Sequence, residues 1–223
     1  MTGRRFVIPD IHGCARSLEA LLRDVLHLRK SDTLFLLGDY IDRGPRSKEV
    51  VDRIIYLKKS GYDLHTLRGN HEEMILRACS NQDCNRVWML NGGRTTLESF
   101  GIDSPCDLPS LYKSFFAGLK YFIELDDYIL VHAGLNRDAD DPFSDMDTML
   151  WSRPDSSAKV SNIADKAVIS GHTPVTREAI LASVGTGEIL LDNGCVYSSK
   201  PDFGSLTALE LNSLSFYFQK NID

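Results

Sequence analysis

Hydrophobic and polar residues alternate between two patterns in the first part of the chain, one typical of strands and one typical of helices. Short apolar runs at 4–9, 32–37 and 62–67 are typical of β-strands. The two segments between them place apolar residues at the i, i+3, i+4, i+7 spacing of an amphipathic helix, and we expect Ser47 to be the N-cap of the second helix. This order of strand, helix, strand, helix and strand predicts βαβ units and therefore a parallel sheet.

The pattern changes after the third strand. Residues from about 72 to 119 are mostly helical in pattern. Seven apolar runs then follow at short intervals, with few helices between them, which favours antiparallel or mixed strand pairing. These runs lie at 121–125, 128–133, 167–172, 179–183, 188–194, 206–211 and 215–219. We therefore expect one α/β domain over residues 1–223, with two sheets and a helical insertion at about 72–119.

Composition narrows the class of protein without changing this picture. Hydrophobic residues make up 43% of the chain and charged residues 25%, which are ordinary globular values. No apolar run approaches the roughly 20 residues of a membrane helix, and the first residues run directly into a strand without an apolar leader. The net charge of −6 argues against a general nucleic-acid-binding surface. We expect a cytoplasmic monomer that contacts neither membranes nor nucleic acids.

The five cysteines do not form a recognisable framework. Their number is odd and they are scattered through the chain, so we expect all of them to be reduced thiols. No second pair matches the closest two in sequence, which argues against a structural zinc site. The cysteines are Cys14, Cys79, Cys84, Cys106 and Cys195.

Polar side chains follow five of the expected strands, mostly beside a glycine. In open α/β sheets, ligands bind in the crevice beyond the carboxyl ends of the strands, so these residues are candidates for one site. Any one of the histidines alone would more often be structural, but burying so many polar groups costs free energy unless they have partners. The residues are Asp10 and His12; Asp39, Asp42 and Arg43; Asn70 and His71; His132; and His172.

Six of these side chains form a chemically coherent set of metal ligands. Two carboxylates, three imidazoles and one amide oxygen suit borderline metals such as Mn²⁺, Fe and Zn²⁺. The number exceeds what one tetrahedral centre needs and is enough for two metals with a shared carboxylate. A pair of metals about 3.5–4 Å apart is the arrangement that assists phosphoryl transfer.

Five short motifs, in this order, resemble the calcineurin-like metallophosphoesterase superfamily, and more narrowly its phosphoprotein phosphatase branch. They are "DIHG", "GDYIDRG", "RGNHE", "VHAG" and "GHT". The resemblance implies a four-layer α/β/β/α sandwich with two mixed β-sheets. It also implies that one metal is held by Asp10 and His12, that Asp39 bridges both metals, and that the second metal is held by Asn70, His132 and His172.

The expected mechanism is in-line attack on phosphorus by a hydroxide that the two metals share. His71 is the candidate general acid for the leaving group, and we expect Asp42 to orient it and to raise its pKa. Arg43 is the first candidate for a phosphate clamp, and Arg153 in "MLWSRP" is the second.

Three functions remain open at this point. The favoured one is a phosphomonoesterase acting on phosphorylated proteins or peptides, or on a small phosphoester, and most simply a serine/threonine or dual-specificity phosphatase. Two Mn²⁺ ions are the first expectation for its metals, with Fe or Zn²⁺ as alternatives. A symmetrical diadenosine polyphosphate hydrolase uses a similar centre, but such relatives tend to lack the aspartate that Asp42 provides here. The third is a non-catalytic metal-binding module. We expect the helical segment 87–101, "VWMLNGGRTTLESFG", to roof part of the site.

Overall fold

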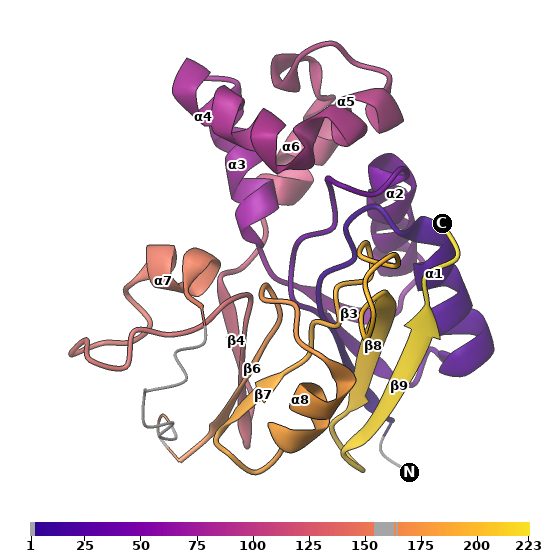
Figure 1. Cartoon of the computed structure of the whole chain (residues 1–223), viewed down its shortest axis with the longest axis vertical. Coiled ribbons are helices and arrows are strands. Elements are labelled where there is room, and N and C mark those ends of the chain that lie inside the picture. Colours follow the sequence, from indigo (N-terminus) through magenta and orange to yellow (C-terminus); the bar gives the residue numbers. More distant parts are fainter. Residues whose placement is uncertain (1–2, 154–162, 164) are drawn as a thin grey trace.

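Two mixed β-sheets lie at the centre of the computed structural model, which describes residues 3–153, 163 and 165–223 (Figure 1). The first sheet has the order β3-β2-β1-β8-β9. Its parallel strands are β1 (Arg5–Ile8), β2 (Thr33–Leu36) and β3 (Asp63–Thr66), as the βαβ pattern predicts. The antiparallel strands β8 (Ser205–Glu210) and β9 (Ser215–Lys220) extend it on the side of β1.

The second sheet has the order β4-β5-β6-β7. Strand β4 (Phe122–Glu124) pairs antiparallel with β5 (Tyr128–Val131). Strands β5, β6 (Ala167–Ser170) and β7 (Glu188–Leu190) are parallel. The expectation of mixed pairing in the second half of the chain is therefore confirmed.

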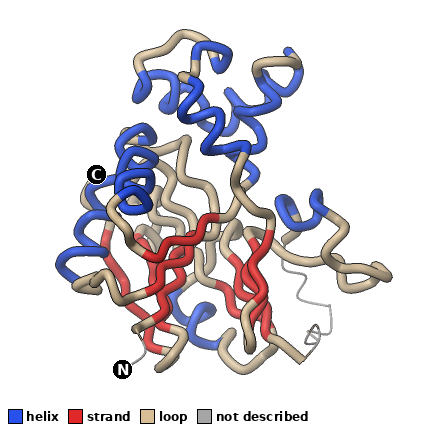
Figure 2. The backbone as a smooth tube through the Cα atoms, turned by 180° about the vertical axis from the view of Figure 1, so that it is seen from behind, coloured by secondary structure: helices blue, strands red, loops and turns tan. Residues whose placement is uncertain are grey.

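The two sheets pack face to face and helices cover their outer faces, which confirms the four-layer architecture. Buried residues from both sheets, including Phe35, Leu130 and Leu209, form the core between them. Helix α1 (Ala15–Ala20), its π-helical continuation η1 (Leu21–Val25) and α2 (Ser47–Lys59) pack on the first sheet. Helix α7 (Met146–Trp151) packs on the second. The tube view shows the strands in the middle with helices on both sides (Figure 2).

The helical insertion forms a separate group of helices above the sheets (Figure 1). It consists of α3 (Asn70–Ala78), α4 (Gln82–Trp88), η2 (Met89–Gly93), α5 (Arg94–Phe100), η3 (Pro105–Asp107) and α6 (Ser110–Ala117). Trp88 and Phe116 are fully buried within it and join the core that covers the first sheet. Among all the residues that the structure describes, no helix combines the length and the apolar character needed to cross a membrane.

Two sequence-based assignments are wrong. The apolar run 179–183 lies largely in helix α8 (Arg177–Ala182) and is not a strand, because the Thr176 side chain accepts a hydrogen bond from the Ala179 N–H group and caps the helix there. Ser47 is the first residue of α2 and not its N-cap, which is Arg46. The Ser47 hydroxyl accepts a hydrogen bond from the Asp42 N–H group instead.

The expectation that all five cysteines are reduced is also wrong. Cys79, at the end of α3, forms a disulfide with Cys106 in η3, across 27 residues of sequence. Packing of η3 against α3 brings the two Cα atoms to 4.8 Å, a proximity that the spacing of the cysteines does not disclose. Cys14, Cys84 and Cys195 are free thiols.

Candidate active site

All six expected metal ligands converge beyond the carboxyl ends of five parallel strands. Each ligand lies within a few residues of its strand end, so the βαβ arrangement and the packing of the two sheets determine where it lies. Five of the six are at least 96% buried, and His172 is half-buried. In chain order the strands and their ligands are β1 with Asp10 and His12, β2 with Asp39, β3 with Asn70 at the start of α3, β5 with His132, and β6 with His172.

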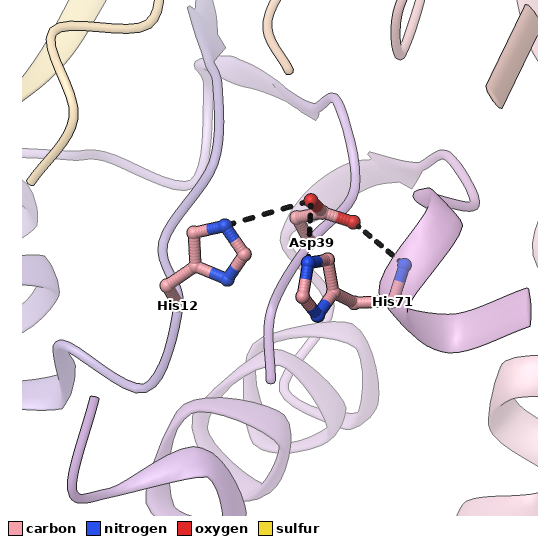
Figure 3. Close-up of side chains that lie close together, drawn as sticks. All are labelled: His12, Asp39 and His71. Atoms are coloured by element: carbon pink, nitrogen blue, oxygen red, sulfur yellow. Dashed lines mark hydrogen bonds and ion pairs between the residues drawn. The ribbon is translucent and has the colours of Figure 1, made fainter. Parts of the chain in front are cut away.

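Asp39 occupies the centre of this group. Its Oδ2 atom lies 3.5 Å from His12 Nε2 and also 3.5 Å from His132 Nε2, on two different sides of the cluster. Figure 3 shows the His12 and His71 rings both directed at the Asp39 carboxylate. This is the position that a carboxylate shared by two cations would take, which is the role that the family resemblance implies for Asp39.

The remaining ligand atoms are grouped around the two histidines. Asp10 Oδ2 lies 3.7 Å from His12 Nε2 on one side. On the other side, Asn70 Oδ1 and His172 Nδ1 each lie 3.1 Å from His132 Nε2. Ligand atoms bound to one metal at about 2.0–2.2 Å are separated from each other by roughly 3–3.5 Å. The distances between these side-chain atoms are therefore close to those that a shared cation requires. Asp10 Oδ2 is moreover buried without any hydrogen-bond partner, which is a costly state for a carboxylate unless a cation binds it.

Two of the imidazoles are oriented for metal binding by backbone carbonyl groups. His12 Nδ1 lies 2.8 Å from the Ile41 carbonyl oxygen, and His132 Nδ1 lies 3.0 Å from that of Leu37. A carbonyl oxygen only accepts, so both Nδ1 atoms carry the hydrogen and both Nε2 atoms present a lone pair to the site. Such outer hydrogen bonds are usual for histidines that bind metals.

The charges of the cluster also favour a cation. Burial raises the pKa of Asp10 well above the usual carboxyl range, and repulsion from Asp192 raises it further. Burial also raises the pKa of Asp39 well above that range, and repulsion from Asp10 raises it further. Burial lowers the pKa of His12 and of His132 well below that of a free imidazole. The imidazoles are therefore neutral, and a divalent cation would stabilise the ionised carboxylates beside them.

Backbone contacts bring the ligand-bearing loops unusually close together. The Ile11 and His12 N–H groups both donate to the Asp39 carbonyl oxygen, at 3.0 and 2.9 Å. A Cβ atom at Gly69 would lie 2.0 Å from Asp39 Oδ1, and one at Gly171 would lie 2.5 Å from Asp10 Oδ1. Only glycine fits at these two positions, which explains the glycines beside the candidate ligands.

Backbone strain is concentrated in the same loops. Nine non-glycine residues have positive φ in the part of the chain that the structure describes, and five of them are candidate site residues. Each such conformation costs about 1–3 kcal/mol and persists only where the surroundings determine it. The five are His12, Asp39, Asp42, Arg43 and His172.

The candidate acid, His71, forms a buried pair with Asp42. His71 Nδ1 lies 2.6 Å from Asp42 Oδ2, and both side chains are fully buried. His71 Nε2 has no hydrogen-bond partner and lies 3.8 Å from Asp39 Oδ2, so it faces the ligand cluster. By distance alone, His71 could also join His12 and Asp39 around a cation.

The proton of this pair is placed differently from our expectation. Burial raises the pKa of Asp42 to about 7, and burial together with Arg43 lowers the pKa of His71, where we expected Asp42 to raise it. In the uncharged pair the extra proton therefore lies on the carboxyl group, which donates it to Nδ1. The hydrogen of the neutral imidazole is then on Nε2 and points into the site.

The two candidate phosphate clamps reach the site to different degrees. Arg43 is half-buried and its guanidinium donates to His12 Nε2. Arg153 is exposed, but its charge and that of Arg43 add to the effect of burial in lowering the pKa of His172 to about 4. Both positive charges therefore act on the ligand cluster. Arg68 donates to Glu73, Tyr121 and two backbone carbonyl groups and is therefore structural.

Sequence reasoning missed Glu72, which holds two of the loops together. Its fully buried carboxylate accepts hydrogen bonds from the N–H groups of Asp39 and Tyr40, both at 2.9 Å, and of Gly69 at 3.0 Å. A glutamate at the third position of a helix that bonds back to the N-cap is a recognisable signal, and it was available in "RGNHE". The two bonds to the loop after β2 were not predictable from the sequence.

Replacing Glu72 with glutamine is expected to lower the free energy of unfolding by about 1–3 kcal/mol, because the new amide NH₂ group does not accept and leaves a buried N–H group unpaired. Chemical denaturation of the metal-free protein would measure this. Glu49→Gln, at an exposed glutamate of α2, is the matched control and should change stability by less than about 0.5 kcal/mol. Equal stability of both variants would contradict the role of Glu72.

Comparisons with known proteins agree with the fold. A family model described as calcineurin-like phosphoesterase matches residues 3–201. Serine/threonine-protein phosphatase 1 of Salmonella typhimurium is 38% identical over 88 residues, which cover 40% of this chain and 38% of that protein. The asymmetrical bis(5'-nucleosyl)-tetraphosphatase PrpE of Bacillus velezensis is 27% identical over 220 residues, covering 87% of this chain and 85% of its own.

A solved structure gives the same fold. A serine/threonine phosphatase from Saccharomyces cerevisiae superimposes with a TM-score of 0.69 at 15% identity, covering 100% of this chain and 81% of that one. The match to the Salmonella phosphatase, by contrast, spans well under two thirds of that relative's length. The family model covers nearly all of the chain, and the chain therefore belongs to the calcineurin-like phosphoesterase family, as a metallophosphoesterase.

Proposed function

We propose that this metallophosphoesterase is a phosphomonoesterase that hydrolyses phosphoserine and phosphothreonine in proteins or peptides. The observation that carries the proposal is the buried pair of His71 and Asp42, with Nδ1 and Oδ2 2.6 Å apart. The unpartnered Nε2 atom of His71 is directed at the ligand cluster and is placed to give a proton to a leaving group there.

The chemistry of the leaving group explains why this pair favours phosphomonoesters of serine and threonine. Their hydrolysis expels an alkoxide, which is strongly basic and needs a proton in the transition state. Hydrolysis of a dinucleoside polyphosphate expels a nucleotide phosphate, which is a far weaker base and leaves without such help. A dedicated, fully buried proton donor is therefore more useful to the first reaction than to the second.

Two divalent cations fit the donor set. One cation would be held by Asp10 and His12. The other would be held by Asn70, His132 and His172, and Asp39 would contribute to both. The mixture of oxygen and imidazole ligands without thiolate makes Mn²⁺ our first choice, with Fe and Zn²⁺ as alternatives. When bound, such a pair supplies Lewis acidity and a nucleophile at neutral pH.

The protein's own residues would orient the substrate. Arg43 contacts His12, and the charge of Arg153 acts on His172, so both would offer planar, bidentate donors to the phosphoryl oxygens. His71 would face the ester oxygen on the side of Asp39. The proton that it gives up is replaced from Asp42 across the hydrogen bond between them.

A dinucleoside polyphosphate hydrolase is the second candidate. It is favoured by the relative from Bacillus velezensis, because that tetraphosphatase aligns with 87% of this chain, whereas the Salmonella phosphatase aligns with 40%. The six candidate metal ligands alone would serve either substrate, since both reactions displace an oxygen leaving group from phosphorus.

A direct competition between substrates tests the proposal. The protein, purified without chelators and supplied with Mn²⁺, is incubated with a panel of phosphoserine, phosphothreonine and phosphotyrosine peptides and, separately, with diadenosine tetraphosphate. We expect a kcat/KM for the best serine or threonine peptide at least about tenfold above that for the dinucleotide, which corresponds to about 1.4 kcal/mol of transition-state binding. EDTA should abolish both activities.

If the protein instead hydrolyses the dinucleotide, the reaction products show which kind of hydrolase it is. Exclusive cleavage of the dinucleotide into two ADP, or into ATP and AMP, would overturn the proposal and assign the symmetrical or the asymmetrical hydrolase. Failure to hydrolyse even p-nitrophenyl phosphate with Mn²⁺ present would leave only a non-catalytic metal-binding module.

A further inference from the structure

The helical insertion makes direct contact with the candidate acid pair. Asp42 takes part in three side-chain hydrogen bonds, and only one of them is with His71. Trp88 Nε1, from α4, donates to Asp42 Oδ2 at 2.8 Å. Thr96 Oγ1, from α5, donates to Asp42 Oδ1 at 2.5 Å. Both residues are fully buried and lie 46 and 54 residues from Asp42 in the sequence.

The insertion also holds the backbone of the same turn. The Asp42 N–H group donates to Thr96 Oγ1 at 2.9 Å, and the Arg43 N–H group points at the Gly92 carbonyl oxygen at 3.4 Å. Asp42 and Arg43 both have positive φ, at 70° and 68°, an arrangement that needs support from its surroundings. Thr96 therefore supports both the side chain and the backbone of Asp42.

Two glycines allow the insertion to approach this closely. Gly92 has φ of 104°, and a Cβ atom there would lie 2.8 Å from the Arg43 nitrogen. A Cβ atom at Gly93 would lie 2.6 Å from the indole ring of Trp88. The segment from Trp88 to Thr96 thus fits around Asp42 and Arg43 as one continuous arch, which we call the 88–96 arch.

We infer that Trp88 and Thr96 of the 88–96 arch are positioning residues for the reaction, fixing the Asp42 carboxylate against His71. The inference rests on the proposed role of His71 as general acid. With two of its three hydrogen bonds fixed by the arch, Asp42 has one orientation, and in it Oδ2 meets His71 Nδ1. The insertion then acts on proton transfer to the leaving group, beyond the roofing role that we expected from the sequence.

Two variants test this role, of which Thr96→Val is nearly isosteric and Trp88→Phe keeps a smaller aromatic ring. Trp88→Phe and Thr96→Val each remove one hydrogen bond to Asp42, and each should lower kcat for phenyl phosphate by about tenfold, which lies within the range that losing a partner costs a buried polar group. For p-nitrophenyl phosphate, whose leaving group needs little protonation, kcat should fall less than about threefold. Thr96→Ser keeps the hydroxyl group and should restore the rate with phenyl phosphate.

Tyr112→Phe is the matched control. It removes a hydrogen bond of 2.7 Å from the insertion to another aspartate, Asp52 of α2, and leaves Asp42 untouched. Its effect should be the same for both substrates. In the His71→Asn background, Trp88→Phe and Thr96→Val should cause no further change in the ratio of the two rates, because the group that they position is gone.

A readout independent of catalysis completes the test. Proton NMR of the zinc-loaded protein, which is diamagnetic, should show a downfield signal from the proton in the hydrogen bond between Asp42 and His71, and this signal should be absent in His71→Asn. This signal should move or broaden in Trp88→Phe and Thr96→Val and remain in place in Tyr112→Phe.

The outcomes separate this inference from the proposed function. If His71→Asn changes the ratio of the two rates but the arch variants lower both rates equally and leave the NMR signal in place, the arch only packs the insertion and the inference is wrong. If His71→Asn itself lowers both rates equally, the acid role fails, and with it the basis of the inference. A shifted signal with an altered rate ratio in both arch variants supports the positioning role.

Discussion

Asp39→Asn is expected to reduce the bound metal from about two ions per chain to one or none and to lower kcat/KM by at least about 10³, which corresponds to roughly 4 kcal/mol of transition-state stabilisation. Asp39 Oδ2 is the only carboxylate oxygen equidistant, at 3.5 Å, from His12 Nε2 and His132 Nε2 among the residues that the structure describes. Its replacement by an NH₂ group puts a donor where two cations would share an acceptor. Elemental analysis and titration calorimetry with Mn²⁺ would measure the loss.

The fold should survive this change, which makes the result interpretable. Asp39 Oδ1 accepts a hydrogen bond from the His71 N–H group at 3.0 Å, and the amide oxygen of asparagine can keep it. Asp63→Asn, at an exposed carboxylate of β3, is the control and should retain both metal and activity. Full metal content in Asp39→Asn would remove the assignment of a shared ligand and, with it, the pair of cations.

The cluster of candidate ligands was predictable because each of its residues lies close in sequence to a recognisable strand. Each candidate ligand follows, within a few residues, a strand whose apolar run is visible in the sequence. His132, for example, is the residue directly after β5. Parallel strands bring their carboxyl ends to one edge, so identifying the strands was almost enough to bring the ligands together. The residues at the corner between β3 and α3, Asn70 and His71, are the clearest case, because there a candidate metal ligand and the candidate acid follow each other at the start of a helix.

What supports the cluster was not predictable, because it depends on tertiary contacts. Trp88 and Thr96 lie in a helical pattern in which a buried tryptophan and threonine read as ordinary core residues, and nothing in that pattern connects them to Asp42. The same is true of the disulfide between Cys79 and Cys106, which depends on how η3 packs against α3.

The error over His71 has a different physical cause. From the sequence, a carboxylate beside an imidazole suggests an ion pair, in which the imidazole pKa rises. In the structure both groups are fully buried, and removal from water disfavours the charged form of each. Burial is a property of the whole fold, so the residue types predict the pair correctly and the position of its proton wrongly.

His71→Asn is expected to lower kcat for an alkyl phosphate, such as glycerol 2-phosphate, by about 10²–10⁴, the usual contribution of a general acid. For p-nitrophenyl phosphate the loss should be less than about tenfold, because p-nitrophenolate is a good leaving group without a proton. Steady-state rates at saturating substrate and Mn²⁺ would measure both. His65→Asn, at a half-exposed histidine of β3 that stacks on Phe35, is the control and should change neither rate.

The metal content of His71→Asn decides between the two chemical roles that the geometry allows. His71 Nε2 lies close enough to Asp39 Oδ2, at 3.8 Å, to serve as a ligand or as a proton donor. A ligand would take metal with it when removed, and the loss of rate would then be the same for alkyl and aryl phosphates. A proton donor leaves both cations bound and gives a loss that grows with the basicity of the leaving group. Because Nδ1 is already held by Asp42 and Nε2 carries a hydrogen in the uncharged pair, we expect the second result.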